Sequence, residues 1–133
     1  MGAVPLYGRG EGAYRLLMID RAGQIAVIFS SLHTGEDPEG YAAAADAMGA
    51  LAAAQPGYAG IESARGADGF GITVSYWADE ASALAWRNHP EHQRIRDAGR
   101  ERWYTRYEVT VARVDRGYAW SRDLSPSTKP PSS

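Results

Sequence analysis

Two closely spaced histidines, His89 and His92, are the side chains of this sequence best suited to exchanging protons near neutral pH. His92 is predicted to lie on the apolar stripe of a helix, together with Ile95, Ala98 and Gly99. A neutral imidazole at this position can take a proton from a bound phenol. The competing interpretation is a core histidine that is hydrogen-bonded to a neighbour. His92 is therefore the candidate general base.

The other histidines give weaker signals. His89 precedes Pro90, and such a pair is more typical of the start of a new helix than of a catalytic base. His89 and His92 can approach one helical face, but no acidic residue at a recognised ligand spacing completes a metal site. His33 is predicted to lie in a loop without an evident companion. The sequence has no cysteine, which excludes thiolate catalysis and cysteine-based zinc sites, and we expect no bound metal.

Large aromatic and apolar side chains near the candidate base can line a pocket for a flat aromatic substrate. The candidate substrate-binding residues are Phe29, Tyr76, Trp77, Ile95 and Trp103. Ordinary core and interface packing explains the rings equally well. Trp86 and Arg87 are further catalytic candidates, since an arginine can hold an anionic substrate or a developing oxyanion. Arg87 can instead pair with Glu91 one helical turn later.

The segment 70–100 must position most of these residues, and its pattern changes from strand to helix at Asp79. Residues 70–77 alternate with large side chains on both faces, which predicts a strand that is covered on both sides. Helical spacing follows Asp79, whose carboxylate can accept the first free N–H groups of the helix. Pro90 predicts a break at His89–Pro90 and a second helical piece. Arg94, Arg96 and Arg100 are expected to face mostly away from the protein.

The rest of the chain supplies three further strands and one helix. Gln24–Leu32 and Tyr58–Arg65 are predicted strands, Gly40–Ala54 an alanine-rich helix, Trp103–Val114 a long last strand, and Gly117–Trp120 its short continuation. The turn over 66–69 predicts a hairpin between the two strands on either side of it. The resulting order, βαββαβ with an antiparallel sheet, predicts a ferredoxin-like α+β fold.

The predicted sheet has more apolar surface than two helices can cover. The helices cover one face, yet the strands carry large apolar residues on both. We therefore expect the second face to be buried in a two-fold homodimer. The alternative is that an apolar burst at residues 14–19 folds over that face.

Composition sets the remaining bounds. At 133 residues we expect one domain, over 24–120, with a partly flexible N-terminal extension over 1–23 and a disordered Ser/Pro-rich tail over 121–133. Fourteen basic against sixteen acidic residues give a net charge of −2 without a basic run, so no nucleic-acid partner is expected. No apolar run approaches the roughly 20 residues of a membrane span. The start lacks the blocks of a signal peptide, and we expect a cytoplasmic location.

Four motifs resemble the antibiotic biosynthesis monooxygenase family. They are Tyr76-Trp77-x-Asp79-Glu80, Ala85-Trp86-Arg87, His89-x-x-His92 and Trp103-Tyr104 followed by Tyr107. The resemblance spans roughly Gln24 to Trp120 and implies a small dimeric α+β barrel. The family includes polyketide oxygenases, quinol oxygenases, haem-degrading enzymes and members of unknown activity. The resemblance therefore specifies the fold more closely than the substrate.

Within this family the resemblance disfavours haem as a cofactor. The haem-degrading branch carries an axial histidine ten residues after the tryptophan that Trp86 resembles, and here that position is Arg96. The asparagine of the first strand in that branch is replaced near Ser30 or Ser31. The implied function is a cofactor-independent monooxygenase that uses dioxygen on a phenol, quinol or polyketide-type substrate. The alternatives are a non-enzymatic dimer that binds a small molecule or haem, and a haem-degrading enzyme.

Overall fold

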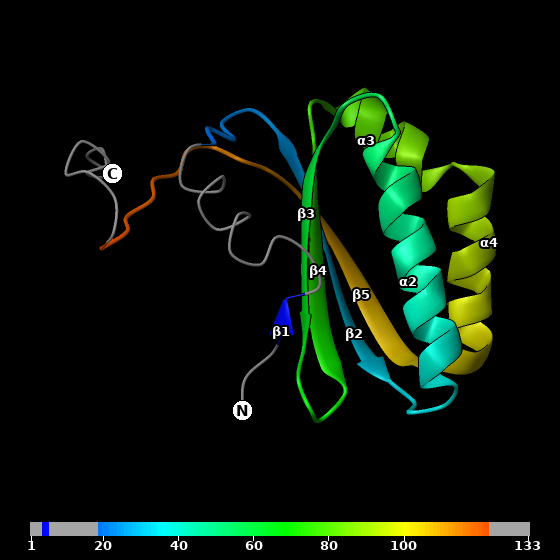
Figure 1. Ribbon diagram of the computed structural model, residues 1–133. Coiled ribbons are helices and arrows are strands. Elements are labelled where there is room, and N and C mark those ends of the chain that lie inside the picture. Colours follow the sequence, from blue (N-terminus) through cyan, green and yellow to red (C-terminus); the bar gives the residue numbers. More distant parts are fainter. Residues whose placement is uncertain (1–3, 6–18, 123–133) are drawn as a thin grey trace.

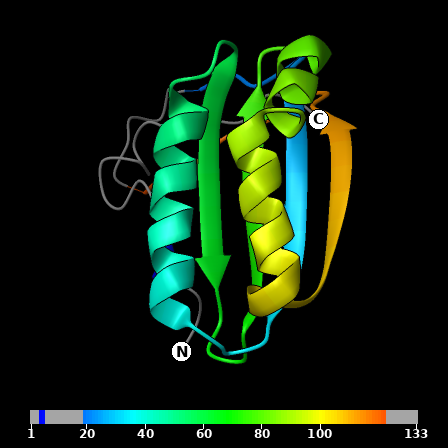
Figure 2. The same ribbon diagram turned by 90° about the vertical axis from the view of Figure 1, so that its right-hand side faces the viewer.

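The computed structural model describes residues 4–5 and 19–122, and in this part of the chain an antiparallel sheet carries helices on one face (Figure 1, Figure 2). The strands are β1 (Val4–Pro5), β2 (Ile25–His33), β3 (Tyr58–Arg65), β4 (Phe70–Trp77) and β5 (Tyr104–Arg113). The helices are α2 (Pro38–Ala53), α3 (Glu80–Arg87), α4 (Pro90–Ala98) and a short π-helix, η1 (Gly99–Trp103). The order of strands across the sheet is β1-β3-β4-β2-β5.

The predicted ferredoxin-like α+β fold is confirmed. From β2 to β5 the elements follow the expected βαββαβ order, with α3, α4 and η1 together forming the second helical crossover. β2 is an inner strand of the sheet, between β4 and the edge strand β5. β1 comes from the predicted N-terminal extension and pairs with β3 at the edge of the sheet. Most of that extension and nearly all of the predicted tail lie outside the described residues.

Two differences from the predicted elements exceed one residue. α2 begins at Pro38 rather than Gly40, because the carboxylate of Asp37 accepts a hydrogen bond from the Gly40 N–H at 3.2 Å and caps the helix. The continuation predicted over 117–120 is not a strand. β2 begins opposite Arg113, so no strand remains to pair with a longer β5.

Local capping explains the paired helices α3 and α4. Asp79 and Ser82 form a reciprocal capping box, in which the Asp79 carboxylate accepts from the Ser82 N–H at 2.8 Å. Pro90 occupies the first turn of α4, and Nδ1 of His89 accepts a hydrogen bond from the Glu91 N–H at 3.1 Å. The predicted break at His89–Pro90 is thus confirmed, and His89 serves as the N-cap of α4.

The π-helix η1 joins α4 to β5 and was not predicted. Its first residue, Gly99, is buried. A Cβ atom at this position would lie 2.5 Å from Cε2 of Tyr104, so the site has no room for a side chain. Its last residue, Trp103, is also buried, and its indole N–H donates to the Asp37 carboxylate at 3.3 Å. π-Helical turns are rare and often occur beside functional sites. Here the turn directs Trp103 and Tyr104 toward the start of α2.

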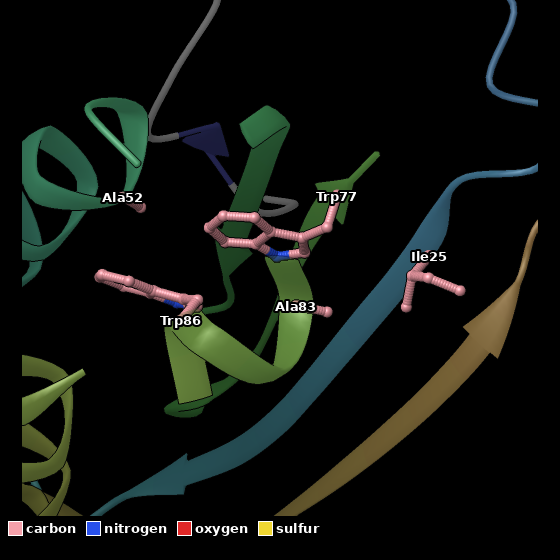
Figure 3. Packing of buried hydrophobic residues seen from close by; sticks show 5 residues of the cluster. All are labelled: Ile25, Ala52, Trp77, Ala83 and Trp86. Carbon is pink, nitrogen blue, oxygen red and sulfur yellow. The ribbon is translucent and has the colours of Figure 1, made fainter. Parts of the chain in front are cut away.

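The core lies between the sheet and its helices. Residues that pair directly across an antiparallel sheet share one face, so Ile25 and Trp77 point together toward the helices. Figure 3 shows Trp77 of β4 beside Trp86 of α3, with Ala52 of α2 on the other side of the indole. Trp77 is completely buried. The aromatic core thus sits where α3 returns onto the sheet.

The opposite face of the sheet carries no helix in the described part of the chain (Figure 1). Phe70 and Ile72 of β4 lie on this face and are 42% and 43% exposed. The face also carries Ile28 and Val74, which pair across β2 and β4 and are half-buried. Among the described residues, no helix is long and apolar enough to span a membrane.

Candidate functional site

Trp77, Trp86 and His92 form a continuous stack between the sheet and the helices, called the tryptophan–histidine stack below. The rings of Trp77 and Trp86 lie 5.8 Å apart with an interplanar angle of 25°. The His92 ring lies 4.6 Å from that of Trp86 at 19°. The indole N–H of Trp77 donates to the Ser75 hydroxyl at 3.0 Å, which fixes the base of the stack. The stack places an imidazole against a flat aromatic surface.

The hydrogen bond made by His92 defines its tautomer. Nδ1 lies 2.9 Å from the backbone carbonyl oxygen of Trp86. Because a carbonyl only accepts, Nδ1 of the neutral ring carries the proton and Nε2 keeps its lone pair. Burial lowers the pKa of His92, and the nearby charges of Arg96 and His89 lower it further, against the opposing effect of the Trp86 hydrogen bond. His92 is therefore a core histidine bonded to a neighbour and also has a free basic nitrogen.

Arg96 lies on the same side of α4 as His92, contrary to the expectation that it faces away. It is half-buried, whereas Arg94 and Arg100 are exposed as predicted. Residues four apart lie on one face of a helix, so the side chain that follows His92 by one turn shares its inward face. Within the described residues, Nε of Arg96 is enclosed and has no hydrogen-bond partner.

A second group of rings, called the tyrosine cluster below, surrounds His33 at the far end of β2. Its members are His33, Phe29, Tyr41, Trp103, Tyr104 and Tyr107. The His33 ring meets that of Tyr41 edge-on at 4.1 Å and that of Tyr104 at 5.5 Å. Burial raises the pKa of Tyr104, and the nearby Tyr41 raises it further. No local sequence pattern indicates this cluster, because its members come from β2, α2, η1 and β5.

The prediction that His33 lies in a loop is wrong, because His33 is the last residue of β2. Its Nε2 atom is enclosed without a hydrogen-bond partner in the described part of the chain. Burial lowers the pKa of His33 to about 4, and the charge of Arg65 contributes to the shift. The imidazole is therefore neutral at physiological pH.

Arg65 stabilises the sheet beneath the tyrosine cluster. Its guanidinium donates to the Ser31 hydroxyl at 2.8 Å and to the Ser31 carbonyl at 3.2 Å, and it also donates to the Gly69 carbonyl. The side chain lies over Gly71, where a Cβ atom would come within 2.6 Å of the guanidinium carbon. Arg65 thus ties β3 to β2 across β4.

The predicted site residues do not all come together. Trp77 and Trp86 join His92 in the stack, Phe29 and Trp103 belong to the tyrosine cluster, and Ile95 is half-buried on α4. Tyr76 and Arg87 lie elsewhere.

Tyr76 lies on the opposite face of the sheet from His92, because side chains alternate along β4. There the Arg21 guanidinium lies 3.7 Å from the centre of its ring, and its hydroxyl donates to Glu62 at 3.3 Å. Arg87 is exposed at the end of α3. The predicted ion pair between Arg87 and Glu91 is not formed, because Glu91 pairs with Arg94 at 3.0 Å.

Among the described residues, no group of three or more histidines or carboxylates is arranged to hold a metal ion. His89 and His92 are both occupied through Nδ1, the first by the Glu91 N–H and the second by the Trp86 carbonyl. Nε2 of His92 is not used by either of these hydrogen bonds.

These features define a class of protein: a small ferredoxin-like α+β domain with an aromatic interior and a neutral histidine between sheet and helices. The family model described as antibiotic biosynthesis monooxygenase matches residues 24–98, and the chain belongs to this family. It is 53% identical over 91 residues to the uncharacterized protein YqjZ of Bacillus subtilis (strain 168). That match covers 68% of this chain and 79% of YqjZ.

Solved structures share the fold at lower identity. Rv0793 from Mycobacterium tuberculosis is 22% identical with a TM-score of 0.60, and the match covers 67% of this chain and 92% of Rv0793. SnoaB, a cofactor-independent oxygenase from Streptomyces nogalater, is 18% identical with a TM-score of 0.59. Here the match covers 79% of this chain and 99% of SnoaB. At these sequence identities, the similarity to solved structures shows a shared fold and nothing further.

Proposed function

We propose that the protein is a cofactor-independent monooxygenase that acts on a phenol, quinol or polyketide-type aromatic substrate. The observation that carries the proposal is the tautomer of His92, which leaves Nε2 as a free base beside the face of Trp86. Membership of the antibiotic biosynthesis monooxygenase family supports it. The likeness in fold to SnoaB, itself a cofactor-independent oxygenase, is consistent with the same chemistry.

The chain's own residues supply three contributions to such a reaction. A flat substrate lies at the His92 end of the tryptophan–histidine stack, Nε2 of His92 takes its acidic proton, and the surrounding side chains exclude water. The resulting carbanion reduces dioxygen directly. For an anthrone-type substrate, a ring methylene becomes a carbonyl group, whose oxygen atom comes from dioxygen. The second oxygen atom leaves as water with the two methylene hydrogens, so atoms and electrons balance.

Oxygen uptake tests the proposal. The purified protein is supplied with anthrone-type and quinol substrates, and His92→Gln is compared with the wild type. Glutamine keeps a donor for the Trp86 carbonyl but cannot act as a base, so we expect the rate to fall by about 10²-fold or more. Arg87→Gln, at an exposed position on α3, is the matched control and should retain the wild-type rate. A His92→Gln variant with full activity would remove His92 from the proposal.

Haem has no part in this proposal. Arg96 stands where the family resemblance places the axial histidine, and a guanidinium has no lone pair to offer iron. Titrating haem into the protein should therefore give no stoichiometric spectrum of a histidine-ligated haem. Such a spectrum, abolished in His92→Ala, would instead favour a haem-binding function with His92 as the ligand.

A further inference from the structure

The Arg96 guanidinium has no counter-charge in the described part of the chain. Its Nε atom is one of two enclosed side-chain nitrogens there that lack a hydrogen-bond partner; the other is Nε2 of His33. An arginine stays charged at any accessible pH, so its unpaired donor costs more than that of a neutral imidazole. No described protein group therefore satisfies Nε of Arg96.

Nearby acids do not provide that counter-charge. The ion pairs among the described residues involve other arginines: Glu91 pairs with Arg94, and Asp37 pairs with Arg102. The other two join Arg113 to Glu80 and Arg116 to Asp115. Asp97 follows Arg96 directly and is exposed on the outer side of α4. The inward face of α4 therefore carries an uncompensated positive charge.

This charge lies beside the candidate base. Arg96 follows His92 by one helical turn, which puts the two side chains on neighbouring positions of one face. The Arg96 charge contributes to the lowered pKa of His92. A protonated His92 would add a second cation next to the first. An anion bound between them removes the repulsion, because it pairs with both.

We propose that Arg96 binds the ionised oxygen of the substrate, so that the protein selects aromatic compounds with an acidic phenol or enol group and holds them as anions. This inference rests on the proposed function and names the substrate class of the same site. The proton of the substrate O–H moves to Nε2 of His92, and the oxyanion accepts hydrogen bonds from the guanidinium. Arg96 is thus a residue that determines specificity, and His92 receives the proton.

Binding of two probe molecules separates this role from a structural one. The ionised form of 4-nitrophenol differs from the neutral form in its absorption spectrum, and 4-nitroanisole is a similar ring that cannot ionise. We expect the wild type to bind the phenolate in preference to 4-nitroanisole. Arg96→Gln should lose about ten- to a hundredfold in phenolate affinity, as expected for hydrogen bonds to a charged group, with unchanged 4-nitroanisole affinity. Arg96→Lys should recover part of the loss.

Stability provides a second readout that an ordinary structural arginine would not give. Arg96→Met keeps an apolar stem of similar length and removes the unpaired charge, so the unliganded variant should melt at the same temperature as the wild type or higher. A structural arginine would lower the melting temperature when replaced. Arg94→Met, which removes an exposed residue of the same helix, is the matched control for both measurements.

The outcomes distinguish this inference from the proposed function. Equal losses for both probes in Arg96→Gln, or no loss for phenolate, would overturn the anion-binding role. Selective loss of phenolate binding without any oxygen uptake by the wild type would support Arg96 and contradict the monooxygenase proposal. If Arg96→Gln fails to fold, the same two probes are used with Arg96→Met and Arg96→Lys. A selective loss of phenolate affinity in Arg96→Met, partly recovered in Arg96→Lys, would support the anion-binding role, and equal losses for both probes would overturn it.

Discussion

His33 and His92, two of the three half-buried histidines, are held by different forces. His92 is fixed by a hydrogen bond to the Trp86 carbonyl and by stacking on the Trp86 ring. His33 has no side-chain hydrogen bond in the described part of the chain and is held by the edges of Tyr41 and Tyr104. Burial is the main reason why the pKa of each lies below the ordinary histidine value. Both are neutral near pH 7, but only His92 has a defined tautomer.

His33→Phe should reduce the loss of stability at acid pH. The folded protein holds the pKa of His33 at about 4, below the value of 6.5 for an unfolded histidine. Between these values the unfolded chain binds more protons, so the free energy of unfolding falls as the pH falls through this window. Phenylalanine retains the ring contacts with Tyr41 and Tyr104 and does not titrate.

Denaturant unfolding near pH 7 and near pH 5 provides the measurement. Near pH 7 the variant should lie within about 3 kcal/mol of the wild type, the usual range when a larger ring is placed in a packed interior. Its free energy of unfolding should fall less than that of the wild type on going to pH 5. Equal falls in the two proteins would show that His33 does not titrate between its folded and unfolded states.

At the scale of secondary structure, features that depend on neighbouring residues could be predicted from the sequence, whereas features that depend on tertiary contacts could not. The cap at Asp79 and the helix start at Pro90 could be predicted, because both depend on side chains within one turn of the residues that they affect. The π-helix could not, since it depends on Tyr104 packing against Gly99. The inward position of Arg96 was missed for a similar reason: polarity predicts an outward face, and the packing of α4 decided otherwise.

The π-helix provides a test of how tightly the tyrosine cluster is packed. In Gly99→Ala the added Cβ atom would meet the Tyr104 ring at 2.5 and 2.8 Å, so the ring must move. We expect a loss of about 1–3 kcal/mol in the free energy of unfolding, as for other overpacked interiors. Gly117→Ala is the matched control, because no atom lies within 4 Å of the added methyl group. Thermal melts of both variants compare the two positions, and equal melting temperatures would show that η1 tolerates a side chain.

At the scale of the whole molecule, the helix-free face of the sheet carries exposed apolar side chains. Phe70 and Ile72 are each about two-fifths exposed there. We propose that a second copy of the chain covers this face in a two-fold homodimer, since an apolar sheet face rarely stays open to water. The other expectation was coverage by residues 14–19, of which 14–18 lie outside the described residues.

Light scattering at micromolar concentration tests the dimer. The wild type should have about twice the chain mass of 14.4 kDa. Ile72→Glu introduces a charge into the proposed interface and should give a monomer. Leu84→Glu, which alters a 51% exposed residue of α3 on the helix side, should remain dimeric. A monomeric wild type would favour coverage by the N-terminal segment.

The inner position of β2, between β4 and β5, affects how the chain folds during its synthesis. β2 is hydrogen-bonded to β4 along one edge and to β5 along the other, and β5 ends at Arg113, about 80 residues after β2. A nascent chain that has reached residue 98 can pair β2 with β4 and place its helices, but one edge of β2 stays open. Such an edge invites pairing with other chains. Because the last long-range pairing completes the sheet, we expect folding to finish only after β5 is made, and slowly for a domain of this size.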